Sequence, residues 1–126
     1  MRRIRGVLIA SLLLSYISTS QAATYHVDQD SIHGNCSDSN PGTLQKPWCT
    51  IDKANDTLQA GDIVYISAGT YTMDTIQPVN SGSSDNVCIT YKNYKEENVT
   101  LQGLVYGIRL RNVSFVAVEG IKFRDQ

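Results

Sequence analysis

Four basic side chains near the end of the chain have a spacing that could form a binding surface for an anionic ligand. They occur in two short runs, Ile108-Arg109-Leu110-Arg111 and Ile121-Lys122-Phe123-Arg124. Because successive side chains of a strand point to opposite faces, we expect the apolar residues to point inward and the basic residues outward. An ordinary solvated surface is the alternative interpretation of so small a cluster.

The remaining reactive residue types suggest structure rather than catalysis. His26 and His33 lie in the first part of the chain, away from the basic runs, and no arrangement of Ser, His and Asp can be inferred from the spacing. We therefore assign no catalytic residue. The segment Asp38-Ser39-Asn40-Pro41-Gly42 has alternating oxygen ligands, but it lacks the later positions of a calcium loop and is typical of a turn. We assign no metal ligand.

The three cysteines favour one disulfide. Cys36 and Cys49 flank the loop that leads into the expected helix, and we predict that they pair. Cys88 lies in a strand-like run, where a buried and unreactive sulfur is expected. Four Asn-x-Ser/Thr sequences could carry glycans; they begin at Asn35, Asn55, Asn98 and Asn112. Asn98 and Asn112 could instead be turn residues, and Asn55, within the helix, is expected to be exposed.

The first 22 residues have the pattern of a secretory signal peptide. Three arginines precede an apolar run, and the small residues Ser20 and Ala22 come before a plausible cleavage site. Removal of residues 1–22 leaves 8 basic and 12 acidic residues, a net charge of −4, which argues against a general nucleic-acid role. We predict a secreted protein, extracellular or periplasmic, with no membrane segment after cleavage.

Residues 23–126 read as one domain made of short strands. Residues 61–71 form the clearest run, with inward residues either Ile63 and Tyr65 or Val64 and Ile66, and similar runs follow at 87–91, 99–101, 108–110, 115–118 and 121–123. Thr50 can cap a single helix over residues 51–59 that covers one end of the strands. The echo between Val99–Gly103 and Val116–Gly120 favours stacked repeats, while a β-sandwich of hairpins is the structural alternative.

The sequence resembles a known family in several motifs that occur in order along the chain. They are Asp38-Ser39-Asn40-Pro41-Gly42-Thr43, Lys46-Pro47-Trp48-Cys49-Thr50-Ile51, residues 60–66 with Gly69-Thr70-Tyr71, and residues 107–110 through 118–123. These resemble the N-terminal regions of secreted right-handed parallel β-helix proteins with the pectin-lyase-like fold, such as chondroitinase B and alginate lyases. The resemblance implies an all-β solenoid, with a capping helix and the first few coils of a longer protein.

The same resemblance implies the function classes to be tested. Lyases of this family act on acidic polysaccharides by β-elimination, with catalytic residues and often calcium on coils further downstream, so we expect no cofactor within this chain. Binding of the polysaccharide would use the cations Arg109, Arg111, Lys122 and Arg124, with Tyr91 and Tyr94 as faces for stacking sugars. A non-catalytic surface protein that binds glycans or proteins is the alternative. We expect a monomer.

Overall fold

The computed structural model describes residues 21–103 and 106–125, which form a mainly β structure with one short α-helix. The predicted signal peptide lies almost wholly outside the described residues. The elements in chain order are β1 (Thr24–Val27), α1 (Ile51–Thr57), β2 (Ile63–Ile66), β3 (Gly69–Thr72), β4 (Ile89–Asn93), the 3₁₀ turn η1 (Tyr94–Glu96), β5 (Val99–Gln102), β6 (Val116–Glu119) and β7 (Ile121–Arg124).

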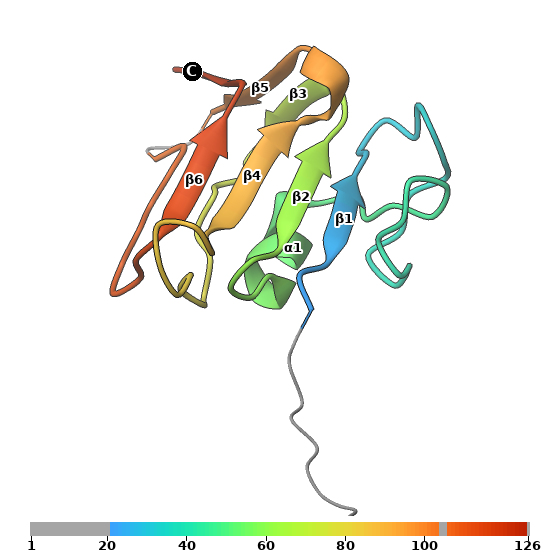
Figure 1. Ribbon diagram of the computed structural model, residues 1–126. Coiled ribbons are helices and arrows are strands. Elements are labelled where there is room, and N and C mark those ends of the chain that lie inside the picture. The colour runs from blue at the N-terminus through green and yellow to red at the C-terminus, as the bar shows by residue number, and fades with distance from the viewer. Residues whose placement is uncertain (1–20, 104–105, 126) are drawn as a thin grey trace, which may run out of the picture.

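The strands form two parallel sheets, and from β2 onward successive strands alternate between them. The first sheet has the order β1-β2-β4-β6 and the second the order β3-β5-β7 (Figure 1). From β2 onward each layer contributes one strand to each sheet, whereas the layer of β1 adds no described strand to the second sheet, and every pairing between these named strands is parallel. The β-sandwich of hairpins is wrong for this chain, because tight hairpins can join only antiparallel strands.

The register explains which residues form the core. Val64 pairs with Tyr91, and Tyr91 with Val118, so one row of side chains runs across three strands on the inner face. Val64 and Tyr91 are fully buried, and Val118 is partly buried against the core. The sequence left open which set of residues 63–66 is inward; the structure selects Val64 and Ile66, and Ile63 and Tyr65 face outward.

Helix α1 begins where the sequence predicts and packs by one apolar face. Thr50 accepts a hydrogen bond from the backbone N–H of Lys53 at 3.2 Å, which is the geometry of an N-cap. Ile51, Ala54 and Leu58 are fully buried, and Figure 1 shows the helix behind β1 and β2. The helix ends at Thr57 rather than at the predicted residue 59 because Leu58 already has an extended backbone.

The loop between β1 and α1 covers the outer edge of β1. His26 N–H donates to the Gly42 carbonyl at 2.7 Å, and Trp48 N–H donates to the His26 carbonyl at 2.9 Å. The predicted disulfide between Cys36 and Cys49 is present in this loop. Asp38 accepts hydrogen bonds from Cys49 N–H and from Thr50, so the loop and the helix start are tied together. An edge covered in this way cannot pair with another chain.

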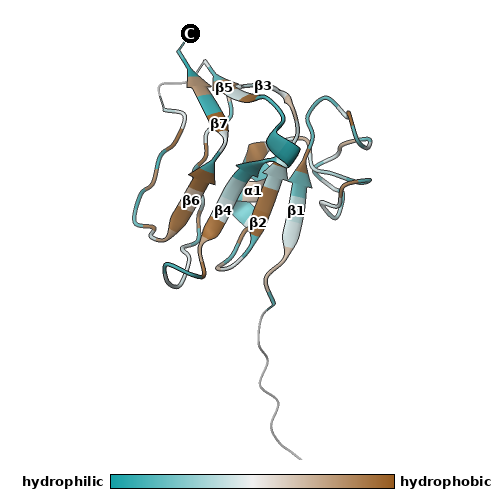
Figure 2. Ribbon diagram, turned by 45° about the horizontal axis from the view of Figure 1, so that its top comes forward, coloured by the Kyte–Doolittle hydropathy of each residue, from teal (hydrophilic) through white to brown (hydrophobic). Residues whose placement is uncertain are grey.

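At the other end, β6 and β7 have no described strand beyond them. Figure 2 shows hydrophobic residues along β6, whereas the loop after β1 is more hydrophilic. Ile108, Leu110 and Phe123, which were expected to point inward to a core, are 37%, 47% and 45% exposed. Phe123 lies in register with the buried Leu101, on the inner row as expected, but an inner-face residue is buried only when a further layer packs on it.

Within the described residues, none of the helices has the length and apolar character to cross a membrane. Cys88 is half-buried and unpaired rather than fully buried, and its sulfur contacts the carbonyls of Ser84 and Asp85.

Candidate functional site

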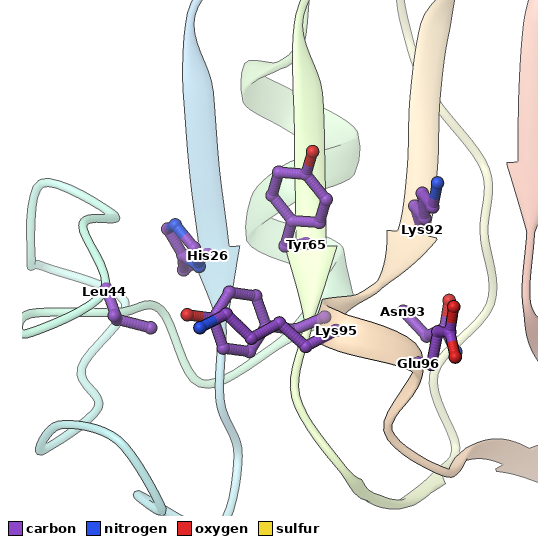
Figure 3. Close-up of a pocket in the computed structure, with 8 residues that line it drawn as sticks. His26, Leu44, Tyr65, Lys92, Asn93, Lys95 and Glu96 are labelled. Carbon is purple, nitrogen blue, oxygen red and sulfur yellow. The ribbon is translucent and has the colours of Figure 1, made fainter.

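A pocket of about 540 Å³ lies on the outward face of the first sheet (Figure 3). It is lined by side chains from β1, β2, β4, the turn η1 and the loop after β1: His26, Leu44, Tyr65, Lys92, Asn93, Tyr94, Lys95 and Glu96. Most of these residues are aromatic or charged, in contrast to the apolar inner face of the same strands.

Strand register aligns three of the lining residues in one row. His26 of β1 pairs with Tyr65 of β2, and Tyr65 pairs with Lys92 of β4. Each of the three follows an inner-face residue by one position, so all three side chains point outward. In Figure 3 they stand side by side on adjacent strands. The row continues to Glu119 of β6, whose carboxylate lies 3.5 Å from the Lys92 ammonium.

Tyr94 joins the row from the turn after β4 and completes an aromatic cluster. Its ring centroid is 5.4 Å from that of His26 and 6.0 Å from that of Tyr65, both with edge-to-face geometry. His26 and Tyr65 are 5.7 Å apart. His33, from the loop after β1, packs against the other side of the cluster, 5.1 Å from Tyr94. Such spacings are those of favourable aromatic pairs.

The backbone of the turn holds Tyr94 in this position. Lys95 and Glu96 have φ values of 45° and 62°, in the left-handed region that residues with a Cβ seldom adopt. Asn93 donates from its side-chain nitrogen to the Glu97 carbonyl at 3.0 Å, and Glu97 N–H donates to the Tyr94 carbonyl at 2.8 Å. The sharp turn places the Lys95 ammonium 5.4 Å from the Tyr94 ring centroid, within the range of a cation–π contact.

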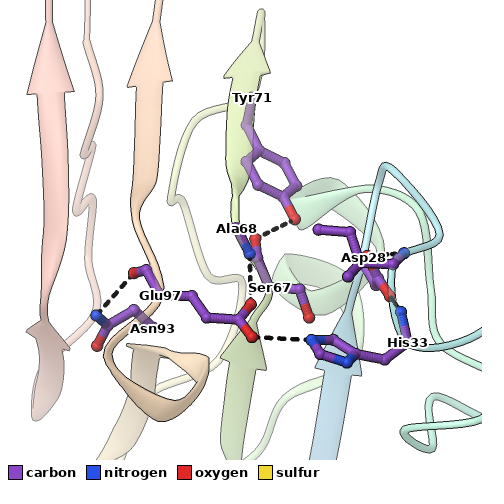
Figure 4. A network of polar contacts seen from close by, with 8 residues as sticks. Asp28, His33, Ser67, Ala68, Tyr71, Asn93 and Glu97 are labelled. Atoms are coloured by element: carbon purple, nitrogen blue, oxygen red, sulfur yellow. Dashed lines mark hydrogen bonds and ion pairs between the residues drawn. The ribbon is translucent and has the colours of Figure 1, made fainter.

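Glu97 connects this turn to two other segments (Figure 4). One carboxylate oxygen accepts from the Ala68 N–H at 2.8 Å, in the connection between β2 and β3. The other lies 2.9 Å from Nε2 of His33. The His33 backbone is itself held by Asp28, which accepts its N–H at 2.7 Å. The turn that carries Tyr94 is therefore fixed from both sides.

The charges in the pocket come from its lysines and from Glu96. Burial, followed by the neighbouring His33, lowers the pKa of His26, although Asp28 acts in the opposite direction. His26 is therefore a neutral imidazole near pH 7. Its Nδ1 is buried and has no hydrogen-bond partner among the described residues. The pocket thus combines aromatic surface with two ammonium groups, Lys92 and Lys95.

The structure places only one of the predicted sugar-contacting residues in this pocket. Tyr94 lines it. Tyr91 was predicted wrongly as a stacking face, because it lies on the inner row of β4, is fully buried, and donates its hydroxyl to Asn55 at 2.8 Å. Both tyrosines had been predicted on the outer surface. On β4, however, Ile89 and Tyr91 face inward, and the residues that alternate with them, such as Lys92, face outward.

The four predicted cations lie elsewhere and do not form one group with Tyr94. Lys122 and Arg124 are exposed on β7 of the second sheet, and Lys122 donates to the Asn98 side chain at 3.1 Å. Arg109 is half-buried with its guanidinium 5.2 Å from the Tyr106 ring centroid, whereas Arg111 is exposed. Arg124 lines a smaller pocket of about 100 Å³ that also contains Asp74. Their role as a binding surface stays a prediction.

Sequence reasoning missed His26, Tyr65, Lys92 and Lys95 as pocket residues. The histidines were judged to be remote from any groove, but parallel stacking brings β1 next to β2 and the turn after β4 next to both. The two-residue period of the strands could have identified Tyr65 and Lys92 as outward-facing, because each follows a buried residue, Val64 or Tyr91. Of the described side chains, no group of three or more His, Cys, Asp or Glu residues could hold a metal ion.

Comparisons with known proteins point toward carbohydrate-related folds. No family model matches the chain. It is 32% identical over 130 aligned positions to the uncharacterized protein YwoF of Bacillus subtilis (strain 168), and the match covers 95% of this chain but 27% of that protein. The chain thus spans about a quarter of the length of the curated relative it matches.

Two solved structures are similar in fold and in sequence. A rhamnogalacturonan lyase superposes with a TM-score of 0.62 and 26% identity, over 81% of this chain and 28% of the lyase. The structure of XylC in complex with xylose superposes with a TM-score of 0.56 and 36% identity, over 64% of this chain and 12% of XylC. The chain therefore has a fold found in polysaccharide-related proteins.

Proposed function

We propose that the chain forms the capping helix and first coils of a secreted, right-handed parallel β-helix protein, and that its aromatic pocket binds an acidic polysaccharide. The alternation of strands between two parallel sheets from β2 to β7 supports the β-helix. The similarity to a rhamnogalacturonan lyase and to the xylose complex of XylC supports a saccharide ligand.

The observation that carries the proposal is the grouping of His26, Tyr65 and Tyr94 with two lysines on one outward face. The C–H face of a sugar ring is apolar and packs on aromatic rings, while its hydroxyl groups need polar partners. The pocket supplies both.

The lysines favour an acidic sugar over a neutral one. Lys92 and Lys95 each present an ammonium group at the pocket, and uronate carboxylates form charge-assisted hydrogen bonds with such groups. Lys92 already contacts Glu119 at 3.5 Å in an exposed pair. An exposed pair of this kind contributes little, so a carboxylate of the ligand can replace Glu119 at low cost.

Cleavage by β-elimination is proposed only for the whole protein. That reaction needs a cation at the carboxylate, a base for the neighbouring proton and an acid for the leaving oxygen, all on one sugar. We assign the pocket the binding role and place catalysis outside this chain. If full-length protein produces no unsaturated-uronate absorbance with pectate, alginate or chondroitin sulfate, the alternative of a non-catalytic glycan-binding protein replaces the lyase.

Affinity electrophoresis tests the binding role directly. Native gels containing polygalacturonate, alginate, chondroitin sulfate or neutral xylan are run with the wild type, with Tyr94→Ala and with the control Tyr106→Ala. Tyr94 is half-buried in the pocket, whereas Tyr106 is exposed, 52% accessible, and lies outside the pocket. Retardation by at least one acidic polysaccharide, abolished only by Tyr94→Ala, is expected. Retardation unchanged in Tyr94→Ala, or absent in the wild type, would contradict the proposal.

A further inference from the structure

The buried carboxylate of Asp62 lies directly against the residue that a signal peptidase would expose. Asp62 is 6% exposed and follows the turn between α1 and β2. One of its oxygens accepts the backbone N–H of Ala23 at 2.8 Å. The other accepts the N–H of Gln59 at 2.9 Å. The carboxylate is thus already aimed at the nitrogen of Ala23.

A buried carboxylate is expected to have a cationic partner, and Asp62 has none in the described ranges. The two ion pairs found there join His33 with Glu97 and Lys92 with Glu119. Two backbone N–H groups satisfy the carboxylate as hydrogen-bond donors, but they bring no formal charge. Burying an ion without a counter-ion is costly. One positive charge at the position of the Ala23 nitrogen would give the Asp62 carboxylate the counter-ion that it lacks.

The sequence supplies a means of creating that charge. Ser20 and Ala22 have the small side chains that precede a signal-peptide cleavage site. Hydrolysis of the bond between Ala22 and Ala23 consumes one water: the Ala22 carbonyl carbon gains the hydroxyl and leaves as a carboxylate, and the freed nitrogen is protonated. A neutral amide donor then becomes an ammonium group at the same place.

We propose that signal-peptide cleavage after Ala22 places the new α-ammonium group of Ala23 in a partly buried ion pair with Asp62, so that processing stabilises the folded domain. The Ala23 carbonyl is held independently, because it accepts the N–H of Ile63 at 3.0 Å just before the pairing of β1 with β2 begins. In the uncleaved chain a cavity of about 250 Å³, lined also by Gln21, borders Ala23 and Asp62, so there is room beside them for the additional N–H protons and their water.

The pH dependence of this ion pair has a definite sign. A free α-amino group has an ordinary pKa of about 7.7 to 8.0, and a buried carboxylate partner raises it in the folded state. Stability gained from a raised pKa is fully present below the unfolded pKa and is lost as the pH rises through the folded pKa. The contribution is therefore present at pH 7 and disappears at higher pH, in a window that begins near pH 8.

The test compares chains that begin at Ala23 with a free or an acetylated amino group. Each is made with Asp62, with Asp62→Asn, and with Asp85→Asn as a control at an exposed carboxylate. At pH 7 the free amine is expected to lower the unfolding equilibrium constant about tenfold relative to the acetylated chain, the equivalent of a one-unit rise in pKa. The difference should vanish above the folded pKa and in Asp62→Asn, and persist in Asp85→Asn.

Equal stability of the free and acetylated chains at pH 7, or a difference that survives in Asp62→Asn, would overturn the proposal. If Asp62→Asn does not fold, the pH profiles of the two chains with Asp62 still decide the question. Mass spectrometry of the protein secreted from the full precursor gives a second measurement. A first residue of Ala23 is expected, and any other first residue contradicts the assignment. These results do not depend on whether the pocket binds saccharide.

Discussion

The hydroxyl of Tyr91 donates a hydrogen bond of 2.8 Å to the side-chain oxygen of Asn55, in the buried space between β4 and α1. The same oxygen accepts the N–H of Gln77 at 3.0 Å, and the Asn55 nitrogen donates to the Thr75 carbonyl at 2.8 Å. Asn55 is 3% exposed, so its expected exposure on the helix was wrong. One side chain thus joins the helix, the first sheet and the segment after β3.

Replacing the two partners should cost different amounts of stability. Tyr91→Phe removes one donor but leaves the oxygen of Asn55 bonded to Gln77, so we expect a loss of about 1 kcal/mol. Asn55→Ala leaves the Thr75 carbonyl, the Gln77 N–H and the Tyr91 hydroxyl without this partner, and we expect about 3 to 5 kcal/mol. Urea unfolding measures both. Similar small losses for the two variants would show that Asn55 does not join these elements.

The burial of Asn55 also indicates whether this Asn-x-Thr sequence carries a glycan. Its nitrogen is used in the hydrogen bond to the Thr75 carbonyl and is packed against the core. We expect the folded protein to carry no glycan at Asn55, even when it is produced in a glycosylating host. Peptide mass spectrometry after enzymatic deglycosylation checks this, and an occupied Asn55 in folded, secreted protein would contradict the placement of the helix.

The two buried tyrosines predict a loss of stability in alkali. Burial, with smaller effects of nearby groups, raises the pKa of Tyr71 and Tyr91 well above the ordinary value. Below about pH 10 both phenols are protonated in the folded and unfolded states, and stability is unaffected. Above about pH 10 the phenols ionise in the unfolded chain but not in the folded one. Each buried tyrosine therefore lowers the free energy of unfolding by about 1.4 kcal/mol per pH unit until the pH reaches its pKa in the folded state.

This slope can be measured against a matched variant. Urea unfolding is followed between pH 9 and pH 11 in the wild type, in Tyr91→Phe and in Tyr106→Phe, whose ring is exposed. The decline with pH should be shallower in Tyr91→Phe alone. An identical decline in all three proteins would mean that Tyr91 ionises in the folded state as readily as in the unfolded chain.

Much of this architecture could be predicted from the sequence, because the signals are local. Thr50 caps the helix, and Cys36 and Cys49 pair as expected. The strand-like runs lie near the strands from β2 to β7, although the run at 108–110 forms only an isolated bridge. The face of each strand was harder to predict, since Tyr65 and Val64 are both apolar enough for a core. The position of the site could not be predicted, because it depends on which strands become neighbours. His26 and Tyr94 are far apart in sequence and meet only through stacking.

The Glu97 side chain should contribute more to stability by accepting the Ala68 N–H than by pairing with His33. Glu97→Gln weakens the exposed pair with His33 but keeps an oxygen for the Ala68 N–H, so we expect a loss of no more than about 1 kcal/mol. Glu97→Ala leaves Ala68 N–H without its acceptor and frees the turn that carries Tyr94. Hydrogen exchange at Ala68 should accelerate in Glu97→Ala only. Equal protection in both variants would show that another group holds the turn.

The disulfide should stabilise the loop that covers β1. Cys36 and Cys49 are 13 positions apart, and closing a loop of this length limits the unfolded chain by roughly 3 kcal/mol on the entropic model. We expect the double variant Cys36→Ser, Cys49→Ser to lose about this much in urea unfolding. Cys88→Ser, at the unpaired cysteine, is the control and should unfold like the wild type. A double variant as stable as the wild type would contradict this role.

The central claim is that the acidic saccharide binds on the outward face of the first sheet, and backbone amide shifts locate it most directly. The ¹⁵N-labelled protein is titrated with an oligosaccharide of the acidic polysaccharide that retards it in native gels, with a neutral xylo-oligosaccharide as the control. We predict that the largest shifts occur at Tyr65, Lys92, Tyr94 and Lys95, and only with the acidic ligand. Shifts centred on Lys122 and Arg124, or no shifts at saturating ligand, would contradict the account.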